Sequence, residues 1–238
     1  MCYPLTIQDD ATRFVVCVDG HASPSTAGVL RSFRRSFQKH GVPLRIHSDN
    51  GIPFAGAGIG RLSRVSVQWM RQGIEVCRSR PSCPRDNPRH ERMHRTLKSF
   101  AARPPCDSAS SQQRRFRSFM SWMNEDRPHE ALGMQTPSSQ YEPSPRECTS
   151  RPRPPEYPAH WEVRRIRRDG QMKLRGELVF VSTALSGDLV GLSEVQDGIW
   201  RLCYRRSVLC FVDTRGEKAR ILAEPRAAEE PEGGPSVG

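Results

Sequence analysis

A stretch dense in proline divides this sequence into two parts. Seven prolines fall between residues 137 and 158. Each proline fixes φ and lacks a backbone N–H, so neither a helix nor a central strand can run through the stretch. We therefore expect a semi-extended linker over 137–158, between a first domain at 1–136 and a second at 159–223. Residues 224–238 are rich in Glu, Pro and Gly and predict a disordered acidic tail.

The first part alternates short strands and helices. Apolar runs at 5–7 and 14–18 flank Asp9-Asp10-Ala11-Thr12, a pattern typical of a hairpin. Ser25 or Thr26 can cap the helix that follows, which should stop near Gly41. Further strands are expected at 44–47 and 73–77, and further helices around Trp69, at 89–101 and around Phe119. This alternation predicts an α/β domain.

The sequence of the second part predicts a small β domain. Short apolar runs suggest six strands near 161–166, 171–174, 178–181, 189–192, 199–204 and 208–212. Asp169-Gly170 and Asp197-Gly198 are hairpin signals between such runs. Six short strands in so few residues predict a small β-barrel.

Charge and cysteine usage narrow the class of protein. Lys and Arg number 37 against 26 Asp and Glu, a formal net charge of +11, which indicates a polyanionic partner such as nucleic acid or an acidic membrane surface. No apolar run is long enough to span a bilayer, and the first ten residues do not resemble a signal peptide. The eight cysteines include no Cys-x-x-Cys pair, which favours reduced thiols in the cytoplasm.

Two carboxylates are candidates for metal chemistry. Asp49 follows a predicted strand, at the edge where α/β sheets bind ligands. Glu91 lies in the first turn of a predicted helix and shares a face with Arg95 and Lys98. Mg²⁺ is held by one or two such carboxylates together with phosphate oxygens. A plain turn at Asp49 and a solvated helix face at Glu91 are the structural alternatives.

The run His90-Glu91-Arg92-Met93-His94 also spells H-E-x-x-H, the zinc metallopeptidase motif. Arg92 puts a positive charge inside the motif, and Arg89 and Arg95 flank it. No convincing third ligand follows. The zinc peptidase is therefore a remote alternative.

Four runs together resemble a known family. They are "YPLTIQDDATRF", "HGVPLRIHSDNGIPFA", "NPRHERMHRTLK" and "MNEDRPHEALGMQTPSSQYEPSPR". In this order they resemble the integrase core domain of bacterial insertion-sequence transposases, which is related to retroviral integrases, over about residues 2–146. The resemblance implies an RNase H-like fold, a DNA substrate, and an Asp-Asp-Glu triad binding two Mg²⁺. The strands of the second part are similar to the small, SH3-like barrel that often follows this core.

Within this resemblance, Asp49 matches the second triad carboxylate and Glu91 the third, so both are expected as catalytic and metal-binding residues. The first family aspartate lies on a strand before the hairpin, where this sequence has no counterpart. The nearby Asp9, Asp10 and Asp19 should not reach the site. The expectation is an integrase core that lacks its first strand, an N-terminally truncated copy with impaired strand cleavage and transfer.

The basic residues of the helix at 89–101 are the expected phosphate contacts: Arg89, Arg92, Arg95 and Lys98. Such contacts bind DNA without reading its sequence. The expected partners are DNA and either a second copy of the chain or a full-length transposase. A non-catalytic protein that binds DNA or interferes with a transposase is the alternative function.

Overall fold

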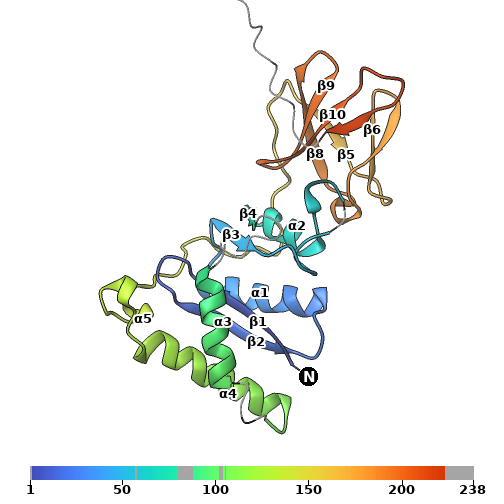
Figure 1. Cartoon of the computed structure of the whole chain (residues 1–238). Helices are drawn as coiled ribbons and strands as arrows, with labels where there is room; N and C mark the ends of the chain where they lie inside the picture. The colour runs from blue at the N-terminus through green and yellow to red at the C-terminus, as the bar shows by residue number, and fades with distance from the viewer. Residues whose placement is uncertain (1, 57, 80–87, 102–103, 105, 223–238) are drawn as a thin grey trace, which may run out of the picture. The chain divides into compact units, whose positions relative to one another are not determined.

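The computed structural model describes residues 2–56, 58–79, 88–101, 104 and 106–222. The chain divides into two compact units (Figure 1). The first comprises Met1–Gly56 and Ser63–Pro152, and the second comprises Ala57–Leu62 and Arg153–Gly238.

The first unit contains four strands and five helices among the described residues. In chain order these are β1 (Tyr3–Gln8), β2 (Val15–His21), α1 (Thr26–His40), β3 (Arg45–Ser48), α2 (Arg64–Arg71), β4 (Glu75–Arg78), α3 (Pro88–Ala101), α4 (Ala109–Ser121) and α5 (Pro137–Gln140). A π-helical turn, Trp122–Asp126, extends α4, and a 3-10 turn lies at Glu130–Leu132.

The expected hairpin is formed by β1 and β2, which pair antiparallel with Ile7 opposite Cys17. Its turn is held by Asp9, whose carboxylate accepts bonds from the backbone N–H and the hydroxyl of Thr12 at 2.8 and 2.7 Å. Arg13 follows in the left-handed region, with φ of 65°. The turn therefore aims the Arg13 side chain in a direction that the sequence pattern alone does not specify.

Helix α1 begins and ends where its sequence predicts. The Ser25 side chain accepts a bond from the Gly28 N–H at 3.2 Å, which caps the helix. The helix ends at Gly41, whose φ of 74° favours glycine. Val29, Phe33 and Phe37 lie on its buried face.

The remaining strands form a parallel pair joined through α2. Strand β3 pairs with β4, with Ile46 opposite Val76. Ser63 and Ser66 form a capping box that starts α2 between them. The described strands of this unit thus form two separate two-stranded sheets, β1-β2 and β3-β4. The expected α/β character is confirmed, and the absence of a first family strand stays a prediction.

Two apolar clusters lie in this unit. One joins Leu5 of β1 to α1, α2 and the β3-β4 pair around the fully buried Trp69. The other joins Val15 and Val18 of β2 to α3 and α4 around Phe119. The hairpin is therefore enclosed between the α1-α2 layer and the α3-α4 layer.

The expected linker at 137–158 differs from the structure over residues 137–152, because residues up to Pro152 belong to the first unit. Tyr141 stacks on Phe14 with ring centroids 4.0 Å apart. The Arg146 guanidinium donates to the carbonyls of Pro43 and Gln72 at 2.7 and 2.9 Å. The segment also begins with the short helix α5, because proline is tolerated in the first turn of a helix, and side chains and carbonyls bind the rest of it to the fold. We call residues 137–152 the strap.

The second unit is mostly antiparallel sheet. Its strands are β5 (Glu162–Arg165), β6 (Gln171–Leu174), β7 (Glu177–Phe180), β8 (Leu189–Gln196), β9 (Ile199–Tyr204), β10 (Ser207–Asp213) and β11 (Arg220–Leu222). One sheet has the order β11-β10-β9-β8-β5, and β6 pairs with β7. Two 3-10 turns lie at Ile59–Arg61 and Thr183–Leu185. The closed, SH3-like barrel stays a prediction.

One expected hairpin of this unit is wrong and one is confirmed. Asp169-Gly170 forms a turn, but β5 pairs with β8 instead of β6. The β6-β7 hairpin turns at Arg175-Gly176, where both residues have positive φ. Asp197-Gly198 does join the paired strands β8 and β9. The expected tail at 224–238 lies outside the described residues.

A short excursion of the chain completes the second unit. The Ile59 N–H donates to the Val181 carbonyl at 3.3 Å, and Gly60 lies against Leu209. In the part of the chain that the structure describes, no helix is long and apolar enough to cross a membrane.

Candidate nucleic-acid and metal site

Asp49 lies directly after β3, at the carboxyl end of the parallel pair. Its Oδ1 accepts the Gly51 N–H at 3.0 Å, which folds the chain into a tight turn. The neighbouring Asn50 donates from Nδ2 to the Ser79 carbonyl at 2.6 Å and ties this turn to the end of β4. These two bonds hold the turn that carries the Asp49 carboxylate. Because Asp49 is exposed, its carboxylate is also open to a ligand.

Helix α3 presents its charged residues outward. Met93, Leu97 and Ala101 are buried, a spacing of four residues that fixes which face packs inward. Glu91, Arg92, Arg95 and Lys98 are all exposed, as is Arg89. All the basic residues expected to contact phosphate are thus on the solvent-facing side of one helix.

The two histidines of α3 point the other way, toward β1. The Oγ1 atom of Thr6 lies 3.0 Å from Nε2 of His90 and 2.7 Å from Nε2 of His94. The two Nε2 atoms are 2.9 Å apart. Burial, followed by the neighbouring His94, lowers the pKa of His90 to about 4.

The charge of Asp49 reaches these histidines. It acts to raise the pKa of both His90 and His94, against the larger effect of burial. Asp49 is therefore within electrostatic range of the two histidines of α3. Among the residues that the structure describes, however, no three His, Cys, Asp or Glu side chains are grouped closely enough to hold a metal ion.

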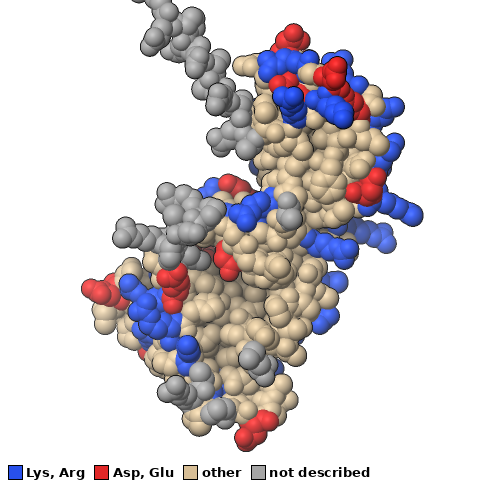
Figure 2. Space-filling view, turned by 45° about the vertical axis from the view of Figure 1, so that its right-hand side comes forward, with Lys and Arg blue, Asp and Glu red and all other residues tan. Residues whose placement is uncertain are grey.

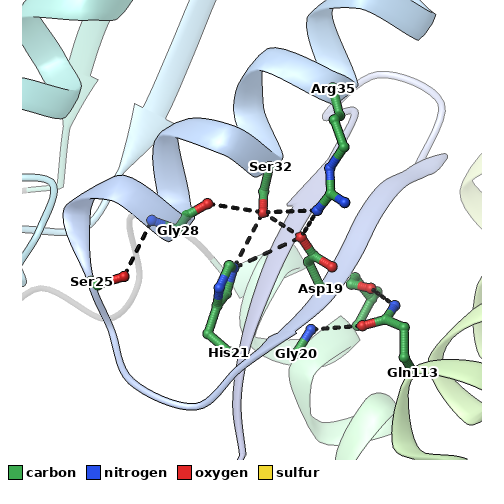
Figure 3. Close-up of polar contacts among 9 residues, drawn as sticks. Asp19, Gly20, His21, Ser25, Gly28, Ser32, Arg35 and Gln113 are labelled. Atoms are coloured by element: carbon green, nitrogen blue, oxygen red, sulfur yellow. Dashed lines mark hydrogen bonds and ion pairs between the residues drawn. The ribbon is translucent and has the colours of Figure 1, made fainter. Parts of the chain in front are cut away.

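The three other nearby aspartates have partners of their own. Asp9 holds the hairpin turn, and Asp10 binds Arg89 with 2.7 Å between Oδ2 and Nη1. Asp19 ends β2 and accepts bonds from Ser32 and Arg35 of α1 (Figure 3). Each of these carboxylates stabilises the fold locally.

The Asp19 cluster contains the residue types of a hydrolase triad but not the arrangement. His21 Nε2 lies 3.2 Å from the Ser32 hydroxyl, while that hydroxyl donates to Asp19 and is also 3.2 Å from the Gly28 carbonyl (Figure 3). Ser32 is only 1 % exposed, inside α1. A nucleophile must be open to substrate and aligned with a base, so this cluster is structural.

Arg13 is a basic residue that the sequence pattern did not single out. Burial lowers its pKa, and so do the like charges of Arg89 and Arg92. Arg13 is therefore close enough to Arg89 and Arg92 to be repelled by both, and the Asp10 carboxylate offsets part of this repulsion by pairing with Arg13 at 3.5 Å and with Arg89 at 2.7 Å. The hairpin brings Arg13 to α3 from far away in sequence, and helix periodicity around α3 contains no signal for it.

Comparison with known proteins gives a match to a protein family by sequence and matches to solved structures by fold. Residues 72–137 match the profile of the integrase core domain family. The catalytic core domain of BIV integrase has a TM-score of 0.45 and 19% identity, over 59% of this chain and 90% of that chain. An intasome of simian T-cell lymphotropic virus, in complex with the PP2A regulatory subunit B56 gamma, has a TM-score of 0.46 and 14% identity, over 87% of this chain and 76% of that one. The resemblance to the integrase core domain is thus confirmed for the segment that contains α3.

Proposed function

Because residues 72–137 match the integrase core domain, we propose that this chain acts on DNA as an integrase- or transposase-type protein. The observation that supports the proposal is that the charge of Asp49 acts on His90 and His94, which share the first turns of α3 with Glu91. The matched segment includes α3 and β4, while Asp49 belongs to the adjoining strand end. Sequence family and local geometry therefore support the same surface.

DNA would lie along the exposed face of α3. Arg92, Arg95 and Lys98 are exposed there, and Arg13 and Arg89 lie near the first of them. Arginine binds phosphate through a planar, permanently charged donor fork. Contacts of this kind fix the position of a duplex on the protein without selecting its sequence.

Asp49 and Glu91 fit Mg²⁺ by their chemistry, since both offer exposed carboxylate oxygens. When bound, Mg²⁺ supplies charge neutralisation at the phosphate under attack. Asp49 would hold it from a turn already fixed by Gly51 and Asn50, and Glu91 from the first turn of α3. The described residues bring no third carboxylate to this place, so we propose impaired strand cleavage and transfer by this chain alone.

The test is a DNA strand-transfer assay with the full chain in MgCl₂, alongside Asp49→Asn and Glu91→Gln. We expect a low, Mg²⁺-dependent activity that both substitutions abolish, and duplex binding that Glu91→Gln strengthens by removing a negative charge. The control is Glu125→Gln, an exposed acid next to α4. Transfer that survives Asp49→Asn undiminished would overturn the assignment.

The alternative is a non-catalytic DNA-binding protein that interferes with a full-length transposase. It is favoured by the same lack of a third carboxylate among the described residues. In this case duplex affinity would be the same with and without Mg²⁺, and no strand transfer would occur at any Mg²⁺ concentration. Inhibition of an active transposase by added chain would then separate interference from simple binding.

We also propose a cytoplasmic location. The described cysteines, Cys2, Cys17, Cys77, Cys106, Cys148, Cys203 and Cys210, are all free. Free thiols persist in reducing compartments.

A further inference from the structure

Three polar atoms converge where β1 passes α3. They are Oγ1 of Thr6 and the Nε2 atoms of His90 and His94, and every pair among them is 2.7 to 3.0 Å apart. The two histidines are four residues apart on a helix, which places their rings on one face, with centroids 4.5 Å apart. Thr6 is buried at 9% exposure, so the backbone of β1 fixes the third atom.

Hydrogen bonds alone do not account for all three short contacts among these atoms. The Thr6 hydroxyl supplies one hydrogen, and a neutral imidazole has a hydrogen on only one of its two nitrogens. If both histidines carried it on Nε2, two donors would face each other at 2.9 Å. If only one did, its hydrogen and that of the Thr6 hydroxyl could serve two of the three contacts, and the third would have no hydrogen. A cation that accepts the lone pairs of both nitrogens removes this conflict.

The charges around His90 and His94 allow a cation to bind between the two imidazoles. Burial favours the neutral imidazoles, which is the form that binds metal. The negative charge of Asp49 acts on both rings. Arg89 is turned toward Asp10, and no arginine is among the charges that shift the pKa of either histidine. The flanking arginines of the sequence motif therefore face away from the two Nε2 atoms.

We propose that His90 and His94 form a binding site for a divalent transition-metal ion, with Zn²⁺ as its typical occupant, next to the Thr6 hydroxyl. Zn–N bonds of about 2.0–2.1 Å in a tetrahedral site place two nitrogens about 3.3 Å apart. The observed 2.9 Å needs only a small opening of the histidine pair. Water completes the coordination, since the described residues supply no group of three His, Cys, Asp or Glu ligands. The site binds metal and is not the site of a peptidase.

The experiment is thermal unfolding of the full chain in ZnCl₂ and, separately, in MgCl₂. We expect Zn²⁺ to raise the melting temperature by about 2–4 °C in a saturable manner, since binding to the folded state stabilises it. Mg²⁺, which prefers oxygen ligands, should leave it unchanged at the same concentration. His94→Asn should abolish the Zn²⁺ shift, and Thr6→Val should reduce it.

The matched control is His160→Asn, an exposed histidine of the second unit, which should keep the full shift. A Zn²⁺ shift that persists in His94→Asn would assign the metal to the free cysteines and overturn the proposal, as would no shift in the unaltered chain. If His94→Asn does not fold, His90→Gln and equilibrium dialysis of the unaltered chain against ZnCl₂ decide: less than one bound ion per chain overturns the site. These readouts need neither DNA nor strand transfer, so they stand or fall separately from the proposed function.

Discussion

The Asp19 carboxylate links β2 to α1 through donors on two successive turns of the helix. It accepts bonds from Ser32 and Arg35, and its own side chain is 16% exposed (Figure 3). A partly buried carboxylate depends on such donors, because losing one leaves charge without compensation. The two donors differ in exposure: Ser32 is buried, and the Arg35 side chain is 67% exposed.

Removal of the Ser32 hydroxyl should therefore destabilise the first unit. We expect Ser32→Ala to lower the free energy of unfolding by about 1–3 kcal/mol, as for a buried group left without its hydrogen bond. Urea denaturation followed by circular dichroism measures it. Ser118→Ala is the control, because Ser118 is exposed on α4 and bonds only to the Arg114 carbonyl in the contacts described. Equal losses in the two variants would contradict the role of Ser32.

Tyr157 gives the second unit a pH dependence. Its hydroxyl donates to the Leu189 carbonyl and accepts the Arg205 N–H, each at 3.1 Å, and burial raises its pKa to about 12 from the usual 10. Below pH 10 both folded and unfolded chains keep this proton. Between pH 10 and 12 the unfolded chain loses it first, so stability should fall as the pH rises.

The measurement is the free energy of unfolding of the chain at pH 9 and at pH 11, compared with Tyr157→Phe. The variant should be less sensitive to this change of pH. Buried Cys203 and Cys210, whose pKa values are also raised by burial, are present in both chains, so their effect cancels. An identical pH response in both would show that Tyr157 is not the group responsible.

At the scale of elements, the strap is attached at the end of α1. The Ser144 N–H donates to the His40 carbonyl at 2.9 Å, and the Val42 N–H donates to the Arg146 carbonyl at 2.7 Å. Gly41 lies between these contacts, where a Cβ atom would overlap the Ser144 carbonyl oxygen. The helix end and the strap thus share one glycine.

Gly41→Ala should cost more than the strain of its positive φ alone. Gly133 is left-handed (φ 62°, ψ 38°) with nothing within 4 Å of an added Cβ, so Gly133→Ala gives the cost of a left-handed backbone alone, about 1 kcal/mol. Gly41, with φ of 74° and ψ of 172°, lies in a region open almost only to glycine, so its backbone adds to the clash with Ser144. We expect Gly41→Ala to exceed this and to make the strap more sensitive to limited proteolysis. Equal costs in the two variants would mean that the strap is not held at this point.

The elements that were predictable depend on local signals. Ser25 and Gly41 mark α1 because capping and left-handed φ are properties of single residues. The hairpin of β1 and β2 follows from two apolar runs and a turn between them. The pairing of β5 with β8, and the attachment of the strap, depend on partners distant in sequence, which local patterns do not identify.

The candidate site also combines features that local sequence predicts with contacts that only the tertiary fold brings about. The exposure of Arg92, Arg95 and Lys98 follows from the helical spacing of Met93 and Leu97, which the sequence shows. The approach of Arg13 to α3, and of Thr6 to His90, requires the hairpin to lie against that helix. Sequence reasoning therefore located the helix and its charges, but not the groups that face it.

At the scale of the whole molecule, the excess of positive charge is the property that a DNA partner would meet first. The net charge is +11, and Figure 2 shows Lys and Arg side chains on both units with acidic side chains among them. Overall charge draws DNA to a protein without specifying where it binds. We propose more narrowly that the exposed face of α3 binds the DNA phosphates.

The most direct test measures duplex DNA affinity against salt concentration for the chain, for Arg92→Ala/Arg95→Ala on α3, and for Arg114→Ala/Arg117→Ala on α4. Both double variants remove two exposed arginines from one helix, so their net charges are equal. We predict that the α3 variant binds more weakly, with a slope of log affinity against log salt smaller by about 1.8, since each phosphate contact contributes about 0.9. The α4 variant should keep the slope of the unaltered chain. Equal changes of slope in the two variants, or none in the α3 variant, would contradict the account.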